Sequence, residues 1–266
     1  MYCQEFIFDG ISSKEYDLLI CSFDGAENGQ ATAGSKIEFS TFKAPKSNRW
    51  VKTGVSYNEQ LTFTFQICKN PCSQDVNKPF TEREIAFFMR WLVRKEYKHL
   101  QLIQEGFENI FYNCQLNVER YLIAGACYGF EVTATCDAPW GWSDINTTAI
   151  SSSSTKTVNI YDSSDEIGVL FPRVELYVYG SGDIRIKNEL TNTETVIKNC
   201  VAGENIVMDN MVITSSKYEN HKTLYDDFNW NWFEIGNTFT NRSNPVTVTG
   251  NCDIALTWRC PRKAVV

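Results

Sequence analysis

The chain has 266 residues, of which 43% are hydrophobic and 21% are charged. These fractions are typical of a globular protein with a buried core and exclude a disordered chain. The formal net charge is −7, and no run of Lys or Arg exceeds two residues, which argues against a protein that grips nucleic acid. The N-terminus lacks the pattern of a secretory signal, and no window approaches eighteen apolar residues. We therefore expect a soluble protein that is made in a cytoplasm and does not insert into a membrane.

The ten cysteines are widely and irregularly spaced, which favours reduced thiols that act as small buried hydrophobes. The one close pair is Cys68 and Cys72, whose spacing is compatible with zinc ligands. There is no second pair, and His99 and His221 are the only histidines. A turn between the two cysteines is favoured over zinc, and we expect no metal site and no cofactor.

The first half of the chain begins with strand-like runs at residues 5–10 and 36–42, with an exposed loop between them at 25–35. Residues 61–67 alternate strictly between apolar and polar side chains, which predicts a strand with one buried face. Further strands are predicted at 110–123 and 128–139.

One helix is predicted within residues 79–100. Thr81 and Glu84 fit a capping box at its start, and apolar side chains recur at helical spacing beyond it. Phe87 and Trp91 widen the apolar stripe past one face of the helix, so we expect a second packing partner, either a sheet of the same domain or a neighbouring subunit. Phe87 and Trp91 are the candidates for such a subunit interface.

Ser, Thr and Asn dominate residues 140–164, and we interpret this stretch as the junction between two domains, 1–142 and 143–266. Beyond it, short strand-like runs alternate with turn residues, which predicts an antiparallel sandwich or jelly roll. The chain is thus expected to be mainly β with one principal helix: an N-terminal α+β domain followed by a C-terminal β-sandwich. The strands predicted in the second domain lie at residues 173–180, 183–188, 195–200, 205–210, 211–216, 227–235, 245–250 and 253–258.

Residues 226–235 form the densest aromatic stretch, DDFNWNWFEI. In a strand, Phe228, Trp230 and Trp232 would share one face. A core strand is favoured because aromatic side chains bury the most area. The alternative is a platform on which sugars stack, with Trp230 and Trp232 as the glycan contacts.

The sequence contains no recognisable catalytic set. Both histidines lie in polar surroundings, and there is no glycine-rich phosphate loop. Acidic pairs at 165–166 and 226–227 offer two carboxylates, as glycosidases need, but turn carboxylates are the favoured interpretation. We expect that the protein is not an enzyme, and a cell-wall glycosidase is the least favoured class.

The succession of these segments resembles the distal tail proteins of long, flexible-tailed bacteriophages, of the kind found in phages and prophages of Gram-positive bacteria. The resemblance runs over essentially the whole chain, in order. Its first half is carried by EFIFDGISSKEYDLLICSFDG, EREIAFFMRWLVRKEYKHLQLI and GFEVTATCDAPWGW. Its second half is carried by SDEIGVLFPRVELYVYGSGDIRIKN, YDDFNWNWFEIGNTFTNRSNPVTVTG and CPRKAVV.

The resemblance implies a structural virion protein at the phage tail tip. Its N-terminal domains form a hexameric ring around a channel at the end of the tail tube, and its galectin-like C-terminal domains project outward. The implied partners are further copies of the chain, the tail tube protein, the tail-tip hub, and receptor-binding or baseplate proteins. DNA passes through the ring without specific binding, and an acidic channel lining would suit that passage.

A carbohydrate-binding module that attaches to host cell-surface glycans is the alternative. It requires that Trp230, Trp232, Trp140 or Trp142 be exposed. A galectin's own sugar site uses a His-Asn-Arg set and a Trp, whereas the second half of this chain holds the single histidine His221. This departure argues against galactoside recognition.

Overall fold

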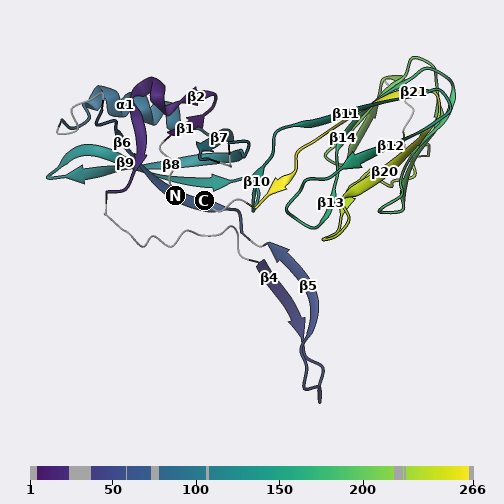
Figure 1. Cartoon of the computed structure of the whole chain (residues 1–266), viewed down its shortest axis with the longest axis horizontal. Coiled ribbons are helices and arrows are strands. Elements are labelled where there is room, and N and C mark those ends of the chain that lie inside the picture. The colour runs from purple at the N-terminus through teal and green to yellow at the C-terminus, as the bar shows by residue number, and fades with distance from the viewer. Residues whose placement is uncertain are drawn as a thin grey trace. The chain divides into compact units, whose positions relative to one another are not determined.

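The computed structural model describes residues 5–23, 37–57, 59–72, 78–105, 108–218, 224 and 226–263. The chain forms two compact units (Figure 1). The first comprises Met1–Ser143 and Arg262–Val266, and the second comprises Asp144–Pro261, so the second unit is inserted into the first. The loop predicted at 25–35 and the histidine at position 221 lie outside the described residues.

The first unit is built on a seven-stranded antiparallel sheet. In β6 (Thr62–Lys69), the alternation buries Phe63, Phe65 and Ile67 and exposes Thr62 and Thr64, which confirms the strand predicted there. In spatial order the strands are β2 (Ile11–Ser12), β1 (Glu5–Phe8), β7 (Lys98–Ile103), β8 (Tyr112–Ile123), β9 (Ala126–Cys136), β6 and β3 (Leu18–Cys21). A 3-10 helix, η1 (Ser13–Tyr16), follows β2, and a short strand, β10 (Gly141–Trp142), lies near the end of the unit's first segment.

One helix, α1 (Glu82–Leu92), packs on this sheet. Thr81 caps it, because its Oγ1 accepts a 3.3 Å hydrogen bond from the Glu84 backbone N–H. The Glu84 carboxylate in turn accepts a 2.7 Å bond from the Thr81 backbone N–H, which confirms the predicted capping box. The helix is shorter than the predicted segment, because the backbone is already extended at Val93 and Lys98 begins β7.

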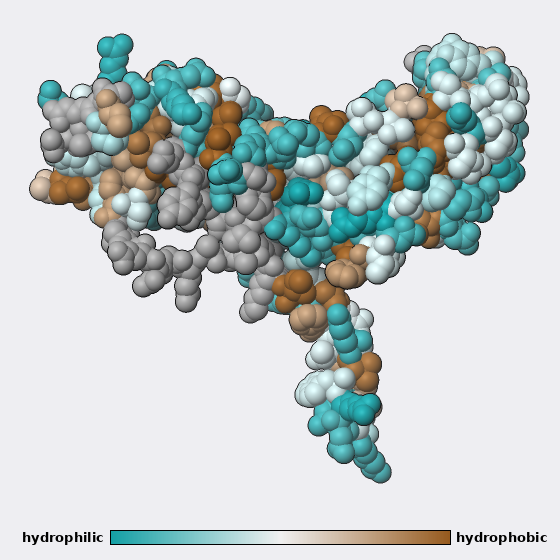
Figure 2. All heavy atoms as spheres, viewed as in Figure 1, coloured by the Kyte–Doolittle hydropathy of each residue, from teal (hydrophilic) through white to brown (hydrophobic). Residues whose placement is uncertain are grey.

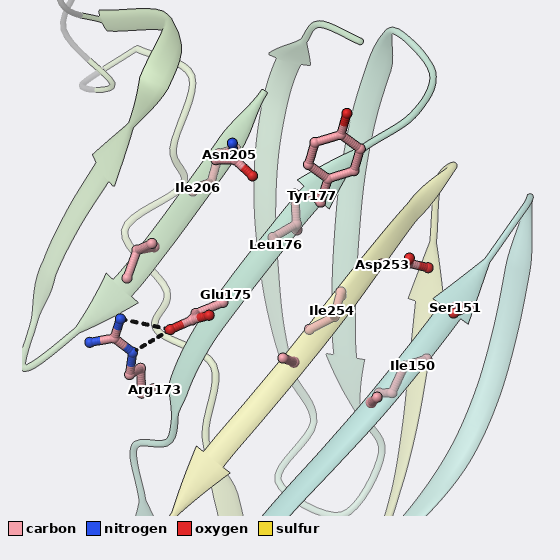
Figure 3. A pocket seen from close by; sticks show the side chains of 13 residues that line it. Ile150, Ser151, Arg173, Glu175, Leu176, Tyr177, Asn205, Ile206, Asp253 and Ile254 are labelled. Carbon is pink, nitrogen blue, oxygen red and sulfur yellow. Dashed lines mark hydrogen bonds and ion pairs between the residues drawn. The ribbon is translucent and has the colours of Figure 1, made fainter. Parts of the chain in front are cut away.

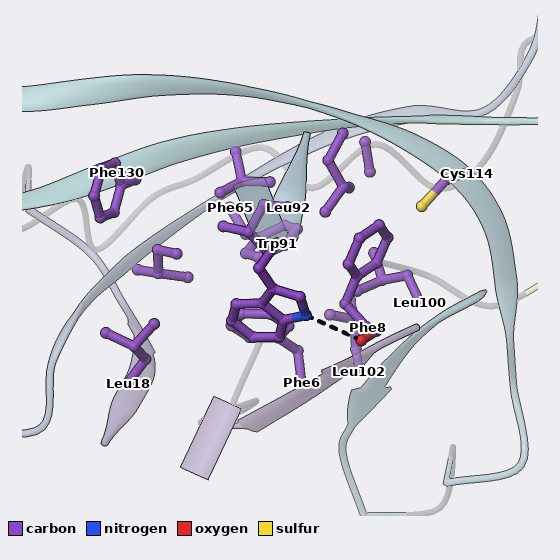
Figure 4. Close-up of a cluster of buried hydrophobic side chains, with 14 of the residues drawn as sticks. Phe6, Phe8, Leu18, Phe65, Trp91, Leu92, Leu100, Leu102, Cys114 and Phe130 are labelled. Atoms are coloured by element: carbon purple, nitrogen blue, oxygen red, sulfur yellow. Dashed lines mark hydrogen bonds between the residues drawn. The ribbon is translucent and has the colours of Figure 1, made fainter. Parts of the chain in front are cut away.

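The core between α1 and the sheet is aromatic (Figure 4). The Trp91 ring stacks on Phe6 with centroids 5.7 Å apart, and its indole Nε1 donates a 3.3 Å hydrogen bond to the backbone oxygen of Phe8. The ring is thus buried without leaving its N–H group unpaired. The other core residues labelled in the figure are Leu18, Phe65, Leu92, Leu100, Leu102, Cys114 and Phe130.

A separate hairpin of β4 (Ile37–Phe42) and β5 (Val51–Tyr57) also belongs to the first unit (Figure 1). Among the described residues, its two strands pair only with each other. Every residue of β4 is exposed, whereas the strands of the large sheet bury alternate side chains. The hairpin therefore has no buried face of its own.

The second unit is a sandwich of two antiparallel sheets (Figure 1). In β14 (Arg173–Val178), the alternation buries Val174, Leu176 and Val178 and exposes the residues between them. The five-stranded sheet has the order β11 (Asn146–Ser152), β21 (Cys252–Trp258), β14, β17 (Asn205–Asp209) and β18 (Val212–Ser215). The four-stranded sheet has the order β12 (Thr155–Tyr161), β20 (Ser243–Thr249), β15 (Gly182–Asn188) and β16 (Thr193–Cys200). The remaining elements are β13 (Gly168–Leu170), which pairs with β19 (Ile235–Asn237), and the 3-10 helix η2 (Ser216–Tyr218). The last strand, β22 (Pro261–Arg262), lies where the chain returns to the first unit.

The stretch at 140–164, interpreted from its composition as a domain junction, is mostly regular structure. Strands β11 and β12 occupy it, and each lies at the edge of one sheet of the sandwich. Their Ser and Thr residues suit this position, because many side chains of an edge strand face solvent. The chain passes from one unit to the other between Ser143 and Asp144.

The strand predicted at 227–235 is wrong, because these residues are irregular up to the start of β19. The backbone pairs with β16 in an isolated bridge between Phe228 and Ile197, and the side chain of Asn229 makes the next bonds to that strand. Its Oδ1 accepts a 3.0 Å hydrogen bond from the Val196 N–H, and its Nδ2 donates a 2.8 Å bond to the Glu194 carbonyl. Trp230 follows in the left-handed region, with φ of 61°, which ends the alternation of faces.

Candidate functional site

A groove of about 530 Å³ lies on the outer face of the five-stranded sheet (Figure 3). Its exposed side chains come from β11, β21, β14 and β17 and alternate along each strand with residues of the sandwich core. Directly paired residues of antiparallel strands point to the same face. The lining therefore falls into rows that run across the strands.

The middle row forms a low floor between two polar rims. It consists of Ala149, Ala255, Glu175 and Val207, each paired with the next across neighbouring strands. The first rim is the adjacent row of Ser151, Asp253, Tyr177 and Asn205. The second rim holds Arg173, two residues before Glu175 on the same strand. The floor is low because two of its four side chains are single methyl groups.

The Arg173 side chain is held in place by two carboxylates. Its Nε donates a 2.8 Å hydrogen bond to Oε1 of Glu175 (Figure 3). Its Nη1 donates a 3.1 Å bond to Oδ2 of Asp209. The hydrogen bond to Glu175 is the main cause that raises the pKa of Arg173. The guanidinium is thus oriented before any ligand arrives.

The opposite rim is ordered around Asp253. Hydrogen bonds from Ser151 and from the Tyr179 hydroxyl, the latter 2.8 Å long, hold the pKa of Asp253 below its ordinary value. The same bond to Asp253 raises the pKa of Tyr179. The Tyr179 ring packs edge-on against Tyr177, with centroids 4.8 Å apart, so Tyr177 stands as a supported wall of the groove.

The two tryptophans predicted as glycan contacts lie outside the groove lining. Trp230 is 47% exposed, whereas Trp232 is partly buried against the sandwich core. Both rings contact buried Phe228, at interplanar angles of 58° and 69°. Trp140 and Trp142 are half-buried and pack edge-on against each other, with centroids 6.1 Å apart.

The two residues predicted at a subunit interface have different surroundings. Trp91 is 4% exposed and belongs to the core of the first unit. This side chain therefore packs within its own unit. Phe87 is 41% exposed and touches Tyr16 edge-on, with centroids 5.0 Å apart. Of the pair, Phe87 alone presents an accessible apolar surface.

Within the described ranges, no group of three or more His, Cys, Asp or Glu side chains is placed to hold a metal ion. The Cys72 N–H donates a 3.0 Å bond to Oδ1 of Asn70, so a turn forms between the two closely spaced cysteines. His99 is exposed on β7, and Asp227 accepts a 2.6 Å bond from the Asn199 amide. Neither acidic pair lines the groove. In the described part of the chain, no helix has both the length and the apolar character needed to cross a membrane.

The sequence prediction missed the groove residues, although one signal for them is present. Arg173, Glu175, Tyr177 and Tyr179 alternate with apolar residues, which marks one face of a strand as polar and aromatic. Their partners Asp253 and Asn205 lie far away in the sequence, and only the strand order brings them beside Tyr177.

Comparisons with protein families relate both units to phage tail proteins. Residues 1–138 match the family model of a phage tail protein N-terminal domain, and residues 140–258 match that of a phage tail C-terminal domain. No curated protein sequence matches the chain.

Among solved structures, the chain is similar to the Dit protein of phage SPP1, described as a paradigm of the hub adsorption apparatus in phages that infect Gram-positive bacteria. The match covers 96% of this chain and 98% of that chain, with a TM-score of 0.64 and 10% sequence identity. At this identity the likeness concerns the fold, and it confirms the predicted fold class and the resemblance to distal tail proteins. With its N-terminal half and its C-terminal half both matched, the chain belongs to a family of phage tail proteins.

Proposed function

We propose that the protein is a distal tail protein, a structural and non-enzymatic component of the virion that forms a ring of about six copies at the end of the tail tube. The observation that carries this proposal is the match of both units to phage tail domains, together with a fold shared over nearly the whole chain with Dit. The ring joins the tail tube protein to the tail-tip hub and to receptor-binding or baseplate proteins. It leaves a channel through which DNA passes.

The exposed β4–β5 hairpin supports self-association. Apolar residues lie on the surface of the hairpin (Figure 2). Phe39 is 59% exposed, Phe42 56% and Trp50 67%. A two-stranded hairpin is marginally stable alone in water, and monomeric proteins rarely expose contiguous apolar patches. A neighbouring copy of the chain would cover these side chains.

The charge of the hairpin favours the same partner. Residues 37–57 hold four cations, Lys43, Lys46, Arg49 and Lys52, against the single anion Glu38, a net charge of +3. Because the whole chain carries −7, the rest carries −10. A basic arm on an acidic protein is complementary to a second copy of that protein.

The open face of the large sheet suits the wall of a channel. Three paired rows cross β8, β9 and β6: Gln115, Thr135 and Thr62; Asn117, Thr133 and Thr64; and Glu119, Glu131 and Gln66. Hydrogen bonds of 3.1 Å join Thr64 to Thr133 and Gln66 to Glu131. These rows contain two carboxylates and no Lys or Arg, so they offer phosphate groups no cationic partner. This supports passage of DNA without specific binding.

Light scattering of the purified chain, followed by negative-stain imaging, tests the ring. We expect closed particles of about six copies with an open centre. The double variant Phe39→Ser/Trp50→Ser should yield monomers, because it removes apolar contact area from the hairpin. Phe239→Ser is the matched control, because Phe239 is 84% exposed in the second unit. A wild-type chain that stays monomeric at every concentration would overturn the proposed self-assembly.

A further inference from the structure

The groove floor has the size and character to seat a sugar ring. Neighbouring strands lie about 4.8 Å apart, so the row from Ala149 to Val207 spans about 14 Å across four strands. The methyl side chains of Ala149 and Ala255 let a flat ligand approach the sheet closely. The volume of about 530 Å³ lies within the range of ordinary small-molecule sites.

The floor and the rims together offer the groups that polyhydroxylated ligands need. Glu175 and Asp253 present carboxylate oxygens that accept hydrogen bonds from hydroxyl groups, while Arg173 and Asn205 present N–H donors (Figure 3). The exposed ring of Tyr177 adds an apolar wall against which one face of a pyranose can pack. Because Arg173, Asp253 and Tyr177 are already held by their neighbours, little side-chain entropy is lost on binding.

The charge of the groove decides between classes of saccharide. One guanidinium, from Arg173, stands against three carboxylates, from Glu175, Asp209 and Asp253, a balance of −2. This balance repels ligands that carry phosphate, sulfate or carboxylate groups. Hydroxyl groups, in contrast, meet an excess of strong acceptors.

We propose that this groove binds an uncharged saccharide, with a pyranose ring seated over Ala149 and Ala255, against Tyr177, and with its hydroxyl groups bonded to Glu175 and Asp253. The inference deepens the proposed function. It rests on that function in one respect, that the groove meets glycans at the tip of a phage tail. The glycan contact proposed here lies on the outer face of the five-stranded sheet and replaces Trp230 and Trp232, the contacts considered from the sequence.

A glycan array carrying uncharged and anionic oligosaccharides, probed with the purified full chain, tests the proposal. We expect binding to uncharged glycans and none to phosphorylated or sulfated ones. Tyr177→Ala removes the wall and Ala255→Leu fills the floor, and each should weaken binding of the best uncharged oligosaccharide by about tenfold or more in calorimetry. Tyr161→Ala is the matched control, because Tyr161 is 64% exposed on β12, in the other sheet. It should bind as the wild type does.

Three results would overturn the proposal: no uncharged glycan bound, binding unchanged in both groove variants, or binding lost in Trp230→Ala while the groove variants retain it. Circular dichroism and urea unfolding check that each variant is folded. If Ala255→Leu fails this check, Glu175→Gln replaces it, since it keeps the side-chain shape and removes the charged acceptor. Light scattering of the same samples separates the two proposals, because ring formation and glycan binding are independent readouts.

Discussion

The hydroxyl group of Tyr179, the residue that follows β14, donates a 2.8 Å hydrogen bond to Oδ2 of Asp253 on β21. The bond needs a protonated phenol and an ionised carboxylate. The pKa of Asp253 is depressed below its ordinary value of 3.8, and that of Tyr179 is raised above 10.0. The stabilisation is therefore fully present above pH 3.8 and is lost as the pH falls through the lower folded pKa of Asp253. On the alkaline side it is fully present below pH 10.0 and is lost as the pH rises through the folded pKa of Tyr179.

We predict that Asp253→Asn moves the pKa of Tyr179 back toward 10.0, because the amide is a weaker acceptor than the carboxylate. Ultraviolet titration of the phenols measures it, and subtraction of the Tyr179→Phe spectrum isolates this group from the other tyrosines. An identical Tyr179 titration in wild type and Asp253→Asn would show that the bond is absent in solution.

The different burial of Trp91 and Phe87 predicts different effects of truncation. Trp91→Ala should lower the free energy of unfolding by about 3–5 kcal/mol, because it empties a large volume of the core. Phe87→Ala should lower it by less than about 1 kcal/mol and should instead weaken ring assembly. Urea unfolding and light scattering measure the two effects. Equal losses of stability would contradict the assigned roles.

The cap of α1 gives a third prediction. Thr81→Ala should cost about 1 kcal/mol of stability, because it leaves the Glu84 N–H without its side-chain acceptor. Thr81→Ser retains the hydroxyl group and should recover most of that loss. The urea midpoint at constant slope measures both variants. Thr81→Ala with wild-type stability would mean that water replaces the cap at no cost.

None of the nine cysteines that the structure describes forms a disulfide, and their environments predict an order of alkylation. Cys72 is exposed, and a hydrogen bond from Cys21 lowers the pKa of half-exposed Cys68, so both should react with iodoacetamide. Burial raises the pKa of Cys136 and Cys200 to about 12, and these thiols should stay unmodified in the folded chain. Peptide mass spectrometry gives the order, and unfolding in urea should remove the difference. Early modification of Cys136 would contradict the packing of the first unit.

Local patterns predicted the elements whose partners are close in sequence or whose periodicity is strict. The capping box at Thr81 and Glu84 and the alternation of β6 are of this kind. The predicted helix extended beyond the end of α1. The basic residues within 94–98 favour a helix C-terminus, but Lys98 pairs in the sheet as the first residue of β7. At Asn229 and Trp230 the failure has another cause: pairing with β16 stops at one bridge, the Asn229 amide bonds that strand instead, and left-handed Trp230 breaks the period.

The groove could not be predicted from any single segment of the sequence. Each of its rows joins residues from strands far apart in sequence, such as Tyr177 with Asp253 on one side and Asn205 on the other. Strand order sets these neighbours, and strand order follows from packing of the whole sandwich. The alternation in β14 alone shows that a polar face exists, without showing what lies beside it.

The chain enters the second unit at Asp144 and leaves it at Pro261, and the segments on both sides belong to the first unit. The core of the first unit is complete by Cys136, before the chain enters the sandwich, so the sandwich is a cassette on which that core does not depend. Domain insertion of this kind lets one part be exchanged while the other keeps its fold. Proteins that share the first unit can thus differ in the second, each by replacing a single continuous stretch of gene.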